Sequence, residues 1–279
     1  MQTLLYTGAH KLLFRNLLHG LERYKAYSRL QSERCLRTEK NDSSLNVFSA
    51  LSHTPHPTLK QPLYTPAELL SESSLLILAG SDTTSTCLAA TLFYLLHHPP
   101  VLARLQADIS TTFCSLEAIR SGPLLLRSHY LRACITESLR LSPPVGGLMA
   151  REVLPGGIKI DAHVFPKGTE IGTPHYALHH DAAYYPAPFL YQPERWLAGD
   201  VTTAQSAFCA FSLGPRGCVG KAMAYQEVMT VLARVLWLYE IRSGGGSAGE
   251  RGEYQLFDTF SSRSVGPLMQ FRARRHAGL

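Results

Sequence analysis

The residues with the clearest chemical potential lie between Phe211 and Gly220, where the sequence reads FSLGPRGCVG. Cys218 stands at the predicted junction of a loop and a helix, with Arg216 two residues before it. The N–H groups of a loop and of a helix end favour a thiolate, which can ligate a metal. Glycines let a flat macrocycle approach the backbone, and an arginine can pair with its carboxylates. A lone cysteine is more often a buried structural thiol, but four companions at fixed spacing disfavour that interpretation.

A second pattern, Glu137-Ser-Leu-Arg140, places opposite charges three residues apart on one face of a predicted helix, where they can meet. Most such pairs are surface salt bridges worth at most about 1 kcal/mol. Taken by itself, this pair indicates a structural role.

A third pattern, the segment AGSDTT at residues 79–84, falls inside a long predicted helix. Glycine and consecutive threonines are poor helix formers, and a hydroxyl that bonds back to the preceding turn can bend a helix and free a carbonyl. Beside a metal, Asp82 and Thr83 could then relay protons. Serines and threonines that merely satisfy themselves in a buried helix explain the same residues, and the segment alone leaves both interpretations open.

The cysteine segment resembles the haem-ligand signature of the cytochrome P450 superfamily, Phe-x-x-Gly-x-Arg-x-Cys-x-Gly. The resemblance implies that Cys218 is the axial ligand of the iron in haem b, bound as a thiolate. A thiolate ligand pushes electron density onto iron and favours O–O cleavage. The cofactor-binding loop around this ligand would be formed by Phe211, Gly214, Arg216 and Gly220.

Other motifs follow the order of the same family. Glu137 and Arg140 resemble its Glu-x-x-Arg pair, and the segment PERW at 193–196 resembles its Pro-Glu-Arg-Phe element with Trp in place of Phe. The resemblance implies a buried charge network of Glu137, Arg140 and Arg195 that fixes the segment delivering the cysteine loop. Removing one partner of such a network leaves an unpaired charge inside the protein.

The resemblance also assigns Thr83, with Asp82, to oxygen activation. Arg151 matches a second propionate-binding position, although an exposed arginine on a strand explains it equally well. Three histidines, His175, His179 and His180, fall in a segment where the family has no metal ligand, and no metal is assigned to them.

Composition narrows the class of protein. The net charge of +6 is modest for 279 residues, and the basic residues are scattered. This argues against nucleic-acid binding and favours an ordinary solvated surface, with a docking face for an acidic redox partner as a minor alternative. The six cysteines include no CxxC pair and follow no signal peptide, which indicates an intracellular, reduced protein.

The predicted fold is mainly α with a minor antiparallel β-sheet, a cytochrome P450 fold shortened at its amino-terminal side. We expect one partial domain over 1–279, with 1–64 as a remnant of preceding helices and 65–275 as the haem-binding core. The predicted elements, in chain order, are a helical region over 1–40, a connection over 41–64, helices over 65–98, 100–113 and 129–141, a small sheet over 149–176, an irregular stretch over 177–210, a helix over 218–241 and a hairpin over 253–273.

The longest of these helices begins with a capping box at Thr65 and Glu68 and ends before Pro99. Its apolar residues predict that it passes through the core. The stretch 75–96 approaches the length of a membrane span, but Asp82 near its centre favours a buried helix.

The function implied by the resemblance is a haem-thiolate monooxygenase that inserts one oxygen atom from O2 into a small apolar substrate. Electrons would come from an NADPH-dependent flavoprotein reductase, and residues 75–78 and 145–148 would border the substrate. The segments resemble fungal microsomal members of secondary metabolism, which implies the endoplasmic reticulum membrane for a full-length protein. Membrane association requires an amino-terminal anchor, and none is visible in the sequence.

Two other functions stay open at this stage. The chain has too few residues for all the family's helices, so a truncated and catalytically inactive family fragment is the main alternative. A haem-thiolate protein that isomerises or dehydrates its substrate is a third, and the Asp82–Thr83 pair argues against it.

Overall fold

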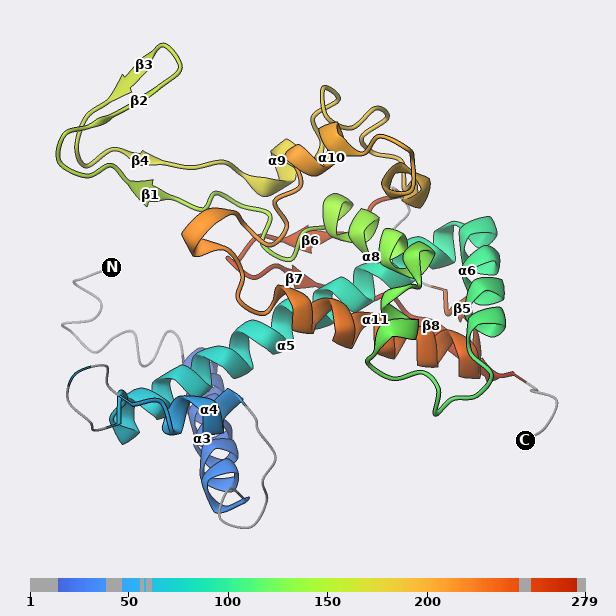
Figure 1. The fold of residues 1–279 in the computed structure, drawn as a ribbon, viewed down its shortest axis with the longest axis horizontal. Coiled ribbons are helices and arrows are strands. Elements are labelled where there is room, and N and C mark those ends of the chain that lie inside the picture. The colour runs from blue at the N-terminus through green and yellow to red at the C-terminus, as the bar shows by residue number, and fades with distance from the viewer. Residues whose placement is uncertain (1–14, 39–46, 56–57, 59–61, 246–251, 275–279) are drawn as a thin grey trace. The chain divides into compact units, whose positions relative to one another are not determined.

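The computed structural model describes residues 15–38, 47–55, 58, 62–245 and 252–274. The described part is mainly α-helical with small antiparallel ladders, as predicted (Figure 1). It forms two compact units that divide between Ser81 and Asp82. The predictions for residues 1–14 and 39–46 lie outside the described residues.

The helices of the described residues are α3 (Arg15–Thr38), α4 (Val47–Ser52), α5 (Pro66–His97), α6 (Pro99–Thr112), α7 (Pro123–Leu126), α8 (His129–Leu141), α9 (His175–His179), η1 (Pro193–Trp196), α10 (Thr202–Ser206), η2 (Gly214–Arg216) and α11 (Lys221–Leu238). The strands are β1 (Arg151–Glu152), β2 (Ile158–Ile160), β3 (His163–Phe165), β4 (Glu170–Ile171), β5 (Tyr239–Ser243), β6 (Leu256–Phe257), β7 (Arg263–Ser264) and β8 (Met269–Ala273).

The first unit contains α3, α4 and the beginning of α5. The predicted capping box is present, because the Thr65 N–H donates to the Glu68 carboxylate at 2.7 Å and the Glu68 N–H donates to the Thr65 hydroxyl at 3.3 Å. These hydrogen bonds lower the pKa of Glu68. Within the same unit, the hydroxyls of Ser28 and Ser74 lie 2.6 Å apart and join α3 to α5.

The hydrophobic residues of helix α5 are buried only in its C-terminal half. Leu75 and Leu78 are exposed, whereas the residues at 90–95 are all buried. The prediction that the whole helix passes through the core is therefore wrong for its first half, because the buried cluster begins only at Cys87. By length and composition alone, α5 qualifies as a membrane-spanning helix among the described residues, and 22% of the qualifying stretch is buried.

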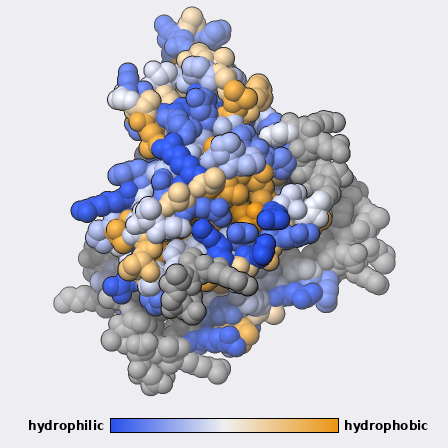
Figure 2. Space-filling model, turned by 90° about the vertical axis from the view of Figure 1, so that its right-hand side faces the viewer, coloured by the Kyte–Doolittle hydropathy of each residue, from blue (hydrophilic) through white to orange (hydrophobic). Residues whose placement is uncertain are grey.

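The core of the second unit lies where the end of α5 meets α6, α8 and α11 (Figure 1). Leu105 and Ile109 point inward from one face of α6, and Leu232 and Leu236 do the same from α11. Burying each such side chain contributes about 1.5–3 kcal/mol. Among the coloured residues in Figure 2, hydrophilic ones alternate with smaller apolar groups. The core therefore holds α8, which carries Glu137 and Arg140, in a fixed place.

The predicted sheet over 149–176 consists of two separate antiparallel ladders, β1 with β4 and β2 with β3, in an arm that extends away from the helices (Figure 1). The predicted hairpin over 253–273 is partly wrong. Strands β6 and β7 pair with each other. Strand β8 instead pairs with β5, and all five residues of each strand take part in the pairing. This pairing also ends α11 at Leu238, three residues before the predicted end. The stretch 177–210 was predicted to be irregular and contains the short helices η1 and α10.

Candidate functional site

The cysteine loop, which we define as residues 211–220, presents Cys218 at the surface. The Cys218 N–H donates to the Phe211 carbonyl at 2.8 Å, and the Gly217 N–H donates to the Gly214 carbonyl at 2.9 Å, so a small turn lies inside a larger one. Gly214 has a φ of +67°, in the left-handed region that favours glycine. Cys218 is an exposed free cysteine, and the neighbouring Val219 is 95% exposed. The backbone of the loop is therefore closed while its thiol is accessible.

Two further glycines shape this loop. Gly220 is the N-cap of α11, which begins three residues after Cys218 and not at the cysteine as predicted. A Cβ at Gly220 would lie 3.8 Å from the Cys218 sulfur, in ordinary contact. A Cβ at Gly217 would lie 3.1 Å from the Gly214 carbonyl oxygen, which is tighter than most real contacts. The inner turn therefore favours glycine at Gly217, a position that the family signature leaves unspecified.

The beginning of the cysteine loop is seated on two helices. The Phe211 ring packs on Tyr225 of α11 with 5.2 Å between ring centroids. The hydroxyl of Tyr225 lies 3.1 Å from the hydroxyl of Thr136 on α8, and the Arg132 guanidinium covers the Tyr225 ring at 4.1 Å. Phe211 thus ties the loop to the core, and no described contact places it over the Cys218 sulfur.

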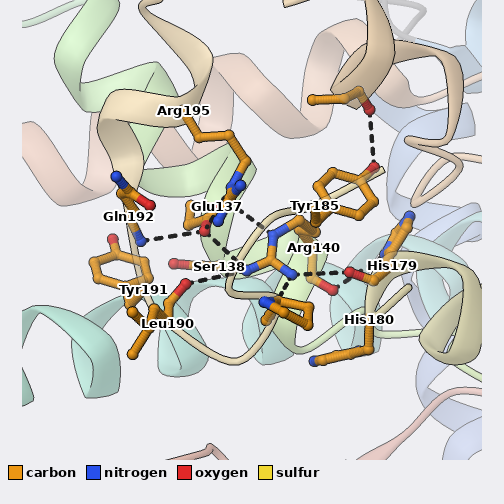
Figure 3. A network of polar contacts seen from close by, with 12 residues as sticks. Glu137, Ser138, Arg140, His179, His180, Tyr185, Leu190, Tyr191, Gln192 and Arg195 are labelled. Carbon is orange, nitrogen blue, oxygen red and sulfur yellow. Dashed lines mark hydrogen bonds and ion pairs between the residues drawn. The ribbon is translucent and has the colours of Figure 1, made fainter. Parts of the chain in front are cut away.

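The structure brings Glu137, Arg140 and Arg195 together in what we call the buried charge anchor (Figure 3). Arg140 Nε donates to Glu137 Oε2 at 3.0 Å, and Arg140 Nη2 donates to Glu137 Oε1 at 2.9 Å. Arg195 Nε approaches Glu137 Oε1 at 3.5 Å. Both Glu137 and Arg140 are fully buried. The pair is therefore a forked ion pair in the core, unlike an ordinary surface bridge.

Arg140 also holds the chain that follows α9. Its Nη1 donates to the carbonyls of His179 at 2.8 Å and Pro188 at 2.7 Å, and its Nη2 donates to that of Leu190 at 3.2 Å (Figure 3). Together with the two bonds to Glu137, these use all five N–H donors of the guanidinium. The cation is therefore completely satisfied, which a buried charge requires.

Glu137 has two partners that the sequence reasoning missed. The Trp196 indole N–H donates to Glu137 Oε2 at 2.8 Å, and the Gln192 backbone N–H donates to Glu137 Oε1 at 3.1 Å. A partly buried indole N–H normally finds an acceptor, so the Trp that replaces the family's Phe was a usable signal. The Gln192 bond comes from the backbone and has no signal in the sequence.

Glu194 lies outside the anchor although it is adjacent to Arg195. Its carboxylate accepts from Arg104 Nη1 at 2.9 Å and from the Tyr130 hydroxyl at 3.0 Å. The Arg104 guanidinium also covers the Tyr130 ring at 3.8 Å. Arg104 and Glu194 are about half exposed, so this pair contributes at most about 1 kcal/mol.

The motif at 79–84 is α-helical at every residue, so α5 continues through it. Serine hydroxyls bond back to carbonyls without ending the helix, as Ser85 does to Asp82 at 3.0 Å. Asp82 is exposed, and its carboxylate accepts from the Ser261 hydroxyl at 3.5 Å. Thr83 is half-buried. The described contact of Asp82 therefore leads to the segment between β6 and β7 and not to the cysteine loop.

Two arginines were predicted to pair with carboxylates of a cofactor. Arg216 belongs to η2 inside the cysteine loop and is exposed. Arg151 begins β1, is exposed, and donates from Nη1 to the Ala150 carbonyl at 2.8 Å. Arg216 shares a loop with Cys218, whereas Arg151 is carried by a different element.

The three histidines occupy different environments. His179 is fully buried, and its burial lowers the pKa from 6.5 to about 3, with His175 as a smaller cause. Burial also lowers the pKa of His175, which lies 3.0 Å from the Val145 carbonyl through Nδ1, and that of His180. Among the described residues, no cluster of three or more metal-ligating side chains is found.

Comparisons with known proteins agree with these motifs. The family model for cytochrome P450 matches residues 20–250. The chain is 43% identical to the cytochrome P450 monooxygenase apf7 of Gibberella fujikuroi, over 95% of this chain and 54% of that protein. It is 40% identical to the cytochrome P450 monooxygenase AKT7 of Alternaria alternata, over 85% of this chain and 50% of that protein. The chain belongs to the cytochrome P450 family, and it spans about half the length of these relatives.

The cysteine loop fits the haem that this family binds. The thiol of Cys218 is accessible, and the flanking side chains Leu213, Val219 and Met223 are apolar and exposed. Exposed apolar residues around a thiol suit a flat apolar macrocycle. Arg216 adds a positive charge on the same loop, which suits the carboxylates of that macrocycle.

Proposed function

We propose that this protein holds haem b through the thiolate of Cys218 and acts in a monooxygenase that inserts one oxygen atom from O2 into an apolar organic substrate. The observation that carries this proposal is the exposed thiol of Cys218 on a loop whose backbone is closed by the 2.8 Å bond to the Phe211 carbonyl. A thiolate ligand gives haem iron the electron density that O–O cleavage needs. The family membership and the names of the relatives support this chemistry.

Each residue of the cysteine loop would make a different contact with the cofactor. Cys218 would ligate the iron, and Arg216 would pair with one propionate through a charge-assisted hydrogen bond. Arg151 would take the second propionate. Gly214 and Gly220 would leave the backbone near the thiol open to the macrocycle. A Cβ at Gly214 meets open space, and a Cβ at Gly220 would lie 3.8 Å from the Cys218 sulfur.

The buried charge anchor would fix the segment that leads to the cysteine loop. Glu137 and Arg140 are carried by α8, and their partners extend from residue 179 to residue 196. Because the anchor is buried and satisfied, it holds this segment in one conformation. Its proposed role is structural.

Asp82 and Thr83 would handle protons on the substrate side. The Asp82 carboxylate is exposed to solvent and the neighbouring Thr83 carries a hydroxyl, the two group types that a proton relay needs. The Ser261 hydroxyl lies 3.5 Å from the Asp82 carboxylate and is its described side-chain partner.

The substrate would be small and apolar, bordered by residues 145–148, and its oxidation would belong to secondary metabolism. Electrons would come from an NADPH-dependent flavoprotein reductase, and the working protein would reside at the endoplasmic reticulum membrane. The exposed and scattered basic residues suit a partner of acidic charge, since the net charge is +6.

The test is the carbon monoxide difference spectrum of the reduced, haem-reconstituted protein. We expect a strongly red-shifted Soret band that Cys218→Ala abolishes and that Cys114→Ala retains, since Cys114 is also an exposed free cysteine. An unshifted band in the unsubstituted protein, or no retained haem, would favour the second candidate, a family member without catalytic activity.

A further inference from the structure

His179 lies between the buried charge anchor and the segment that enters the cysteine loop, and it contacts both. The last residue of α9, it is 0% exposed. Its Nδ1 lies 3.1 Å from the Arg140 carbonyl, and its Nε2 lies 3.0 Å from the backbone nitrogen of Cys209, two residues before the loop begins. The Arg140 side chain in turn donates to the His179 carbonyl at 2.8 Å. Arg140 therefore bonds His179 twice, through the Arg140 side chain and through the Arg140 backbone carbonyl.

The two bonds of the imidazole fix its protonation state. A carbonyl can only accept, so Nδ1 carries the proton that it donates to Arg140. A backbone N–H can only donate, so Nε2 accepts from Cys209 and carries no proton. The ring is thus one neutral tautomer with both nitrogens used. Its lowered pKa, about 3, agrees with this, because a charged imidazole could not accept from Cys209.

We propose that His179 is a positioning residue that transmits the geometry of the buried charge anchor to the cysteine loop and so sets how Cys218 presents its sulfur. The proposal rests on the proposed haem ligation by Cys218. It concerns a residue that the sequence motifs do not include.

Backbone hydrogen bonds and the chain itself connect Cys209, the partner of His179, to Cys218. The Cys209 carbonyl accepts from the Ser212 N–H at 2.7 Å, and Ser212 has a φ of 55°, so the chain turns sharply at the loop entrance. The Phe211 carbonyl then accepts from the Cys218 N–H at 2.8 Å. The Phe208 ring stacks on the His179 ring with 5.4 Å between centroids and 7° between planes. The loop entrance is therefore held by the Phe208 ring stacked on His179 and by the Cys209 N–H bonded to His179.

The exposure of the cysteine loop makes this support necessary. The residues at 213–219 are all exposed, so packing within the protein holds them weakly. In place of packing, the loop is held by the Cys209 hydrogen bond at its entrance and by the contact of Phe211 with Tyr225. A shift at Cys209 would pass directly into the loop.

A Cys–His reactive pair is the competing interpretation, since the Cys209 sulfur lies 3.6 Å from His179 Nε2. That nitrogen already accepts from the Cys209 N–H, and burial raises the pKa of the Cys209 thiol. The imidazole is also poorly suited to take a proton, because its pKa is lowered. The contact between the Cys209 sulfur and His179 is therefore a packing contact, and the proposed role depends on the hydrogen bond from the Cys209 N–H.

Three substitutions separate the two bonds of the ring. His179→Gln keeps an acceptor near the position of Nε2, His179→Asn keeps a donor near the position of Nδ1, and His179→Phe keeps only the ring. His175→Gln is the matched control, because His175 is also buried and bonded to a backbone carbonyl, whereas the Cys209 N–H bonds His179.

The first readout is the fraction of reduced, carbon monoxide-bound protein that shows the red-shifted Soret band. The second is amide hydrogen exchange over residues 208–218 in the haem-free protein. Leaving a buried N–H unsatisfied shifts a local equilibrium roughly 10-fold or more. We expect His179→Phe and His179→Asn to lose most of the red-shifted band and to exchange roughly 10-fold faster over 208–218, while His179→Gln and His175→Gln stay near the unsubstituted protein.

The two readouts keep this proposal distinct from the proposed function. If the unsubstituted protein lacks the red-shifted band, the proposed function fails, and hydrogen exchange still decides whether His179 orders the loop. Equal exchange in His179→Phe and the unsubstituted protein would overturn the positioning role. So would a red-shifted fraction that falls equally in His179→Gln and His179→Asn.

Discussion

The buried charge anchor and the cysteine loop are built in opposite ways. In the anchor, Glu137 and Arg140 are fully buried and every N–H of the guanidinium has an acceptor. In the cysteine loop, backbone hydrogen bonds close the turn, but Cys218 and its neighbours are exposed. A charged network tolerates burial only when it is satisfied, whereas a ligand must be accessible. The contrast is the one that the two proposed roles require, stability for the anchor and ligation for the loop.

The largest expected effect comes from breaking the anchor. Arg140→Met leaves the Glu137 carboxylate buried without its main partner, which costs about 3–5 kcal/mol in the free energy of unfolding. Urea unfolding monitored by circular dichroism measures this loss. The double variant Glu137→Leu/Arg140→Met should lose less than the sum of the two single variants, because no lone charge remains. A loss below about 1 kcal/mol for Arg140→Met would mean that the anchor is not structural.

Acid should weaken the protein through the histidines beside the anchor. His179 has a pKa of about 3 in the folded protein and about 6.5 when unfolded, so the unfolded chain binds more protons between these pH values. The free energy of unfolding therefore carries the full contribution of His179 above pH 6.5 and loses it progressively as the pH falls towards 3. Urea midpoints measured between pH 7.5 and pH 4 test this. His179→Phe should show a flatter pH dependence, and an unchanged slope would contradict the assignment.

Gly214→Ala probes the backbone of the cysteine loop. The φ of +67° is unfavourable for alanine, and no heavy atom lies within 4 Å of the added Cβ, so the cost is conformational alone. We expect the free energy of unfolding to fall by about 1–2 kcal/mol. Gly199→Ala is the matched control, since its Cβ also meets open space and its φ lies outside the left-handed region. Equal effects at the two glycines would show that the turn at Gly214 is not strained.

The smallest expected effect belongs to the exposed ion pair of Arg104 and Glu194. Arg104→Met should change the free energy of unfolding by less than about 1 kcal/mol, because both partners are about half exposed. The same urea titration at low and high salt measures it. A loss as large as that of Arg140→Met would erase the distinction between a buried and an exposed charge pair.

Local signals predicted much of the fold. The capping box at Thr65 and the prolines at 99–100 set both ends of α5, and α8 occupies the predicted residues 129–141. The pairing of β5 with β8 was not predictable in the same way, since it joins strands distant in the sequence and determines where α11 ends. Nor could periodicity show that the first half of α5 is exposed, because its leucines are apolar in either environment.

In the candidate site, too, the sequence predicted some residues and missed others. The motifs named Glu137, Arg140 and Arg195, and the structure brings them together. They gave no indication of His179, because its two hydrogen bonds go to backbone atoms of residues 140 and 209. Side-chain types leave signals in a sequence, whereas backbone acceptors and donors are common to nearly every residue.

The most direct test of the account is X-ray absorption at the iron K-edge of the haem-reconstituted protein, recorded with and without the substitution Cys218→Ala. The account predicts a sulfur atom bonded to iron in the unsubstituted protein and its loss in Cys218→Ala, with both proteins unfolding at nearly the same urea concentration. Iron with only nitrogen and oxygen neighbours in the unsubstituted protein, or a sulfur neighbour that persists in Cys218→Ala, would contradict the assignment of Cys218 as the ligand.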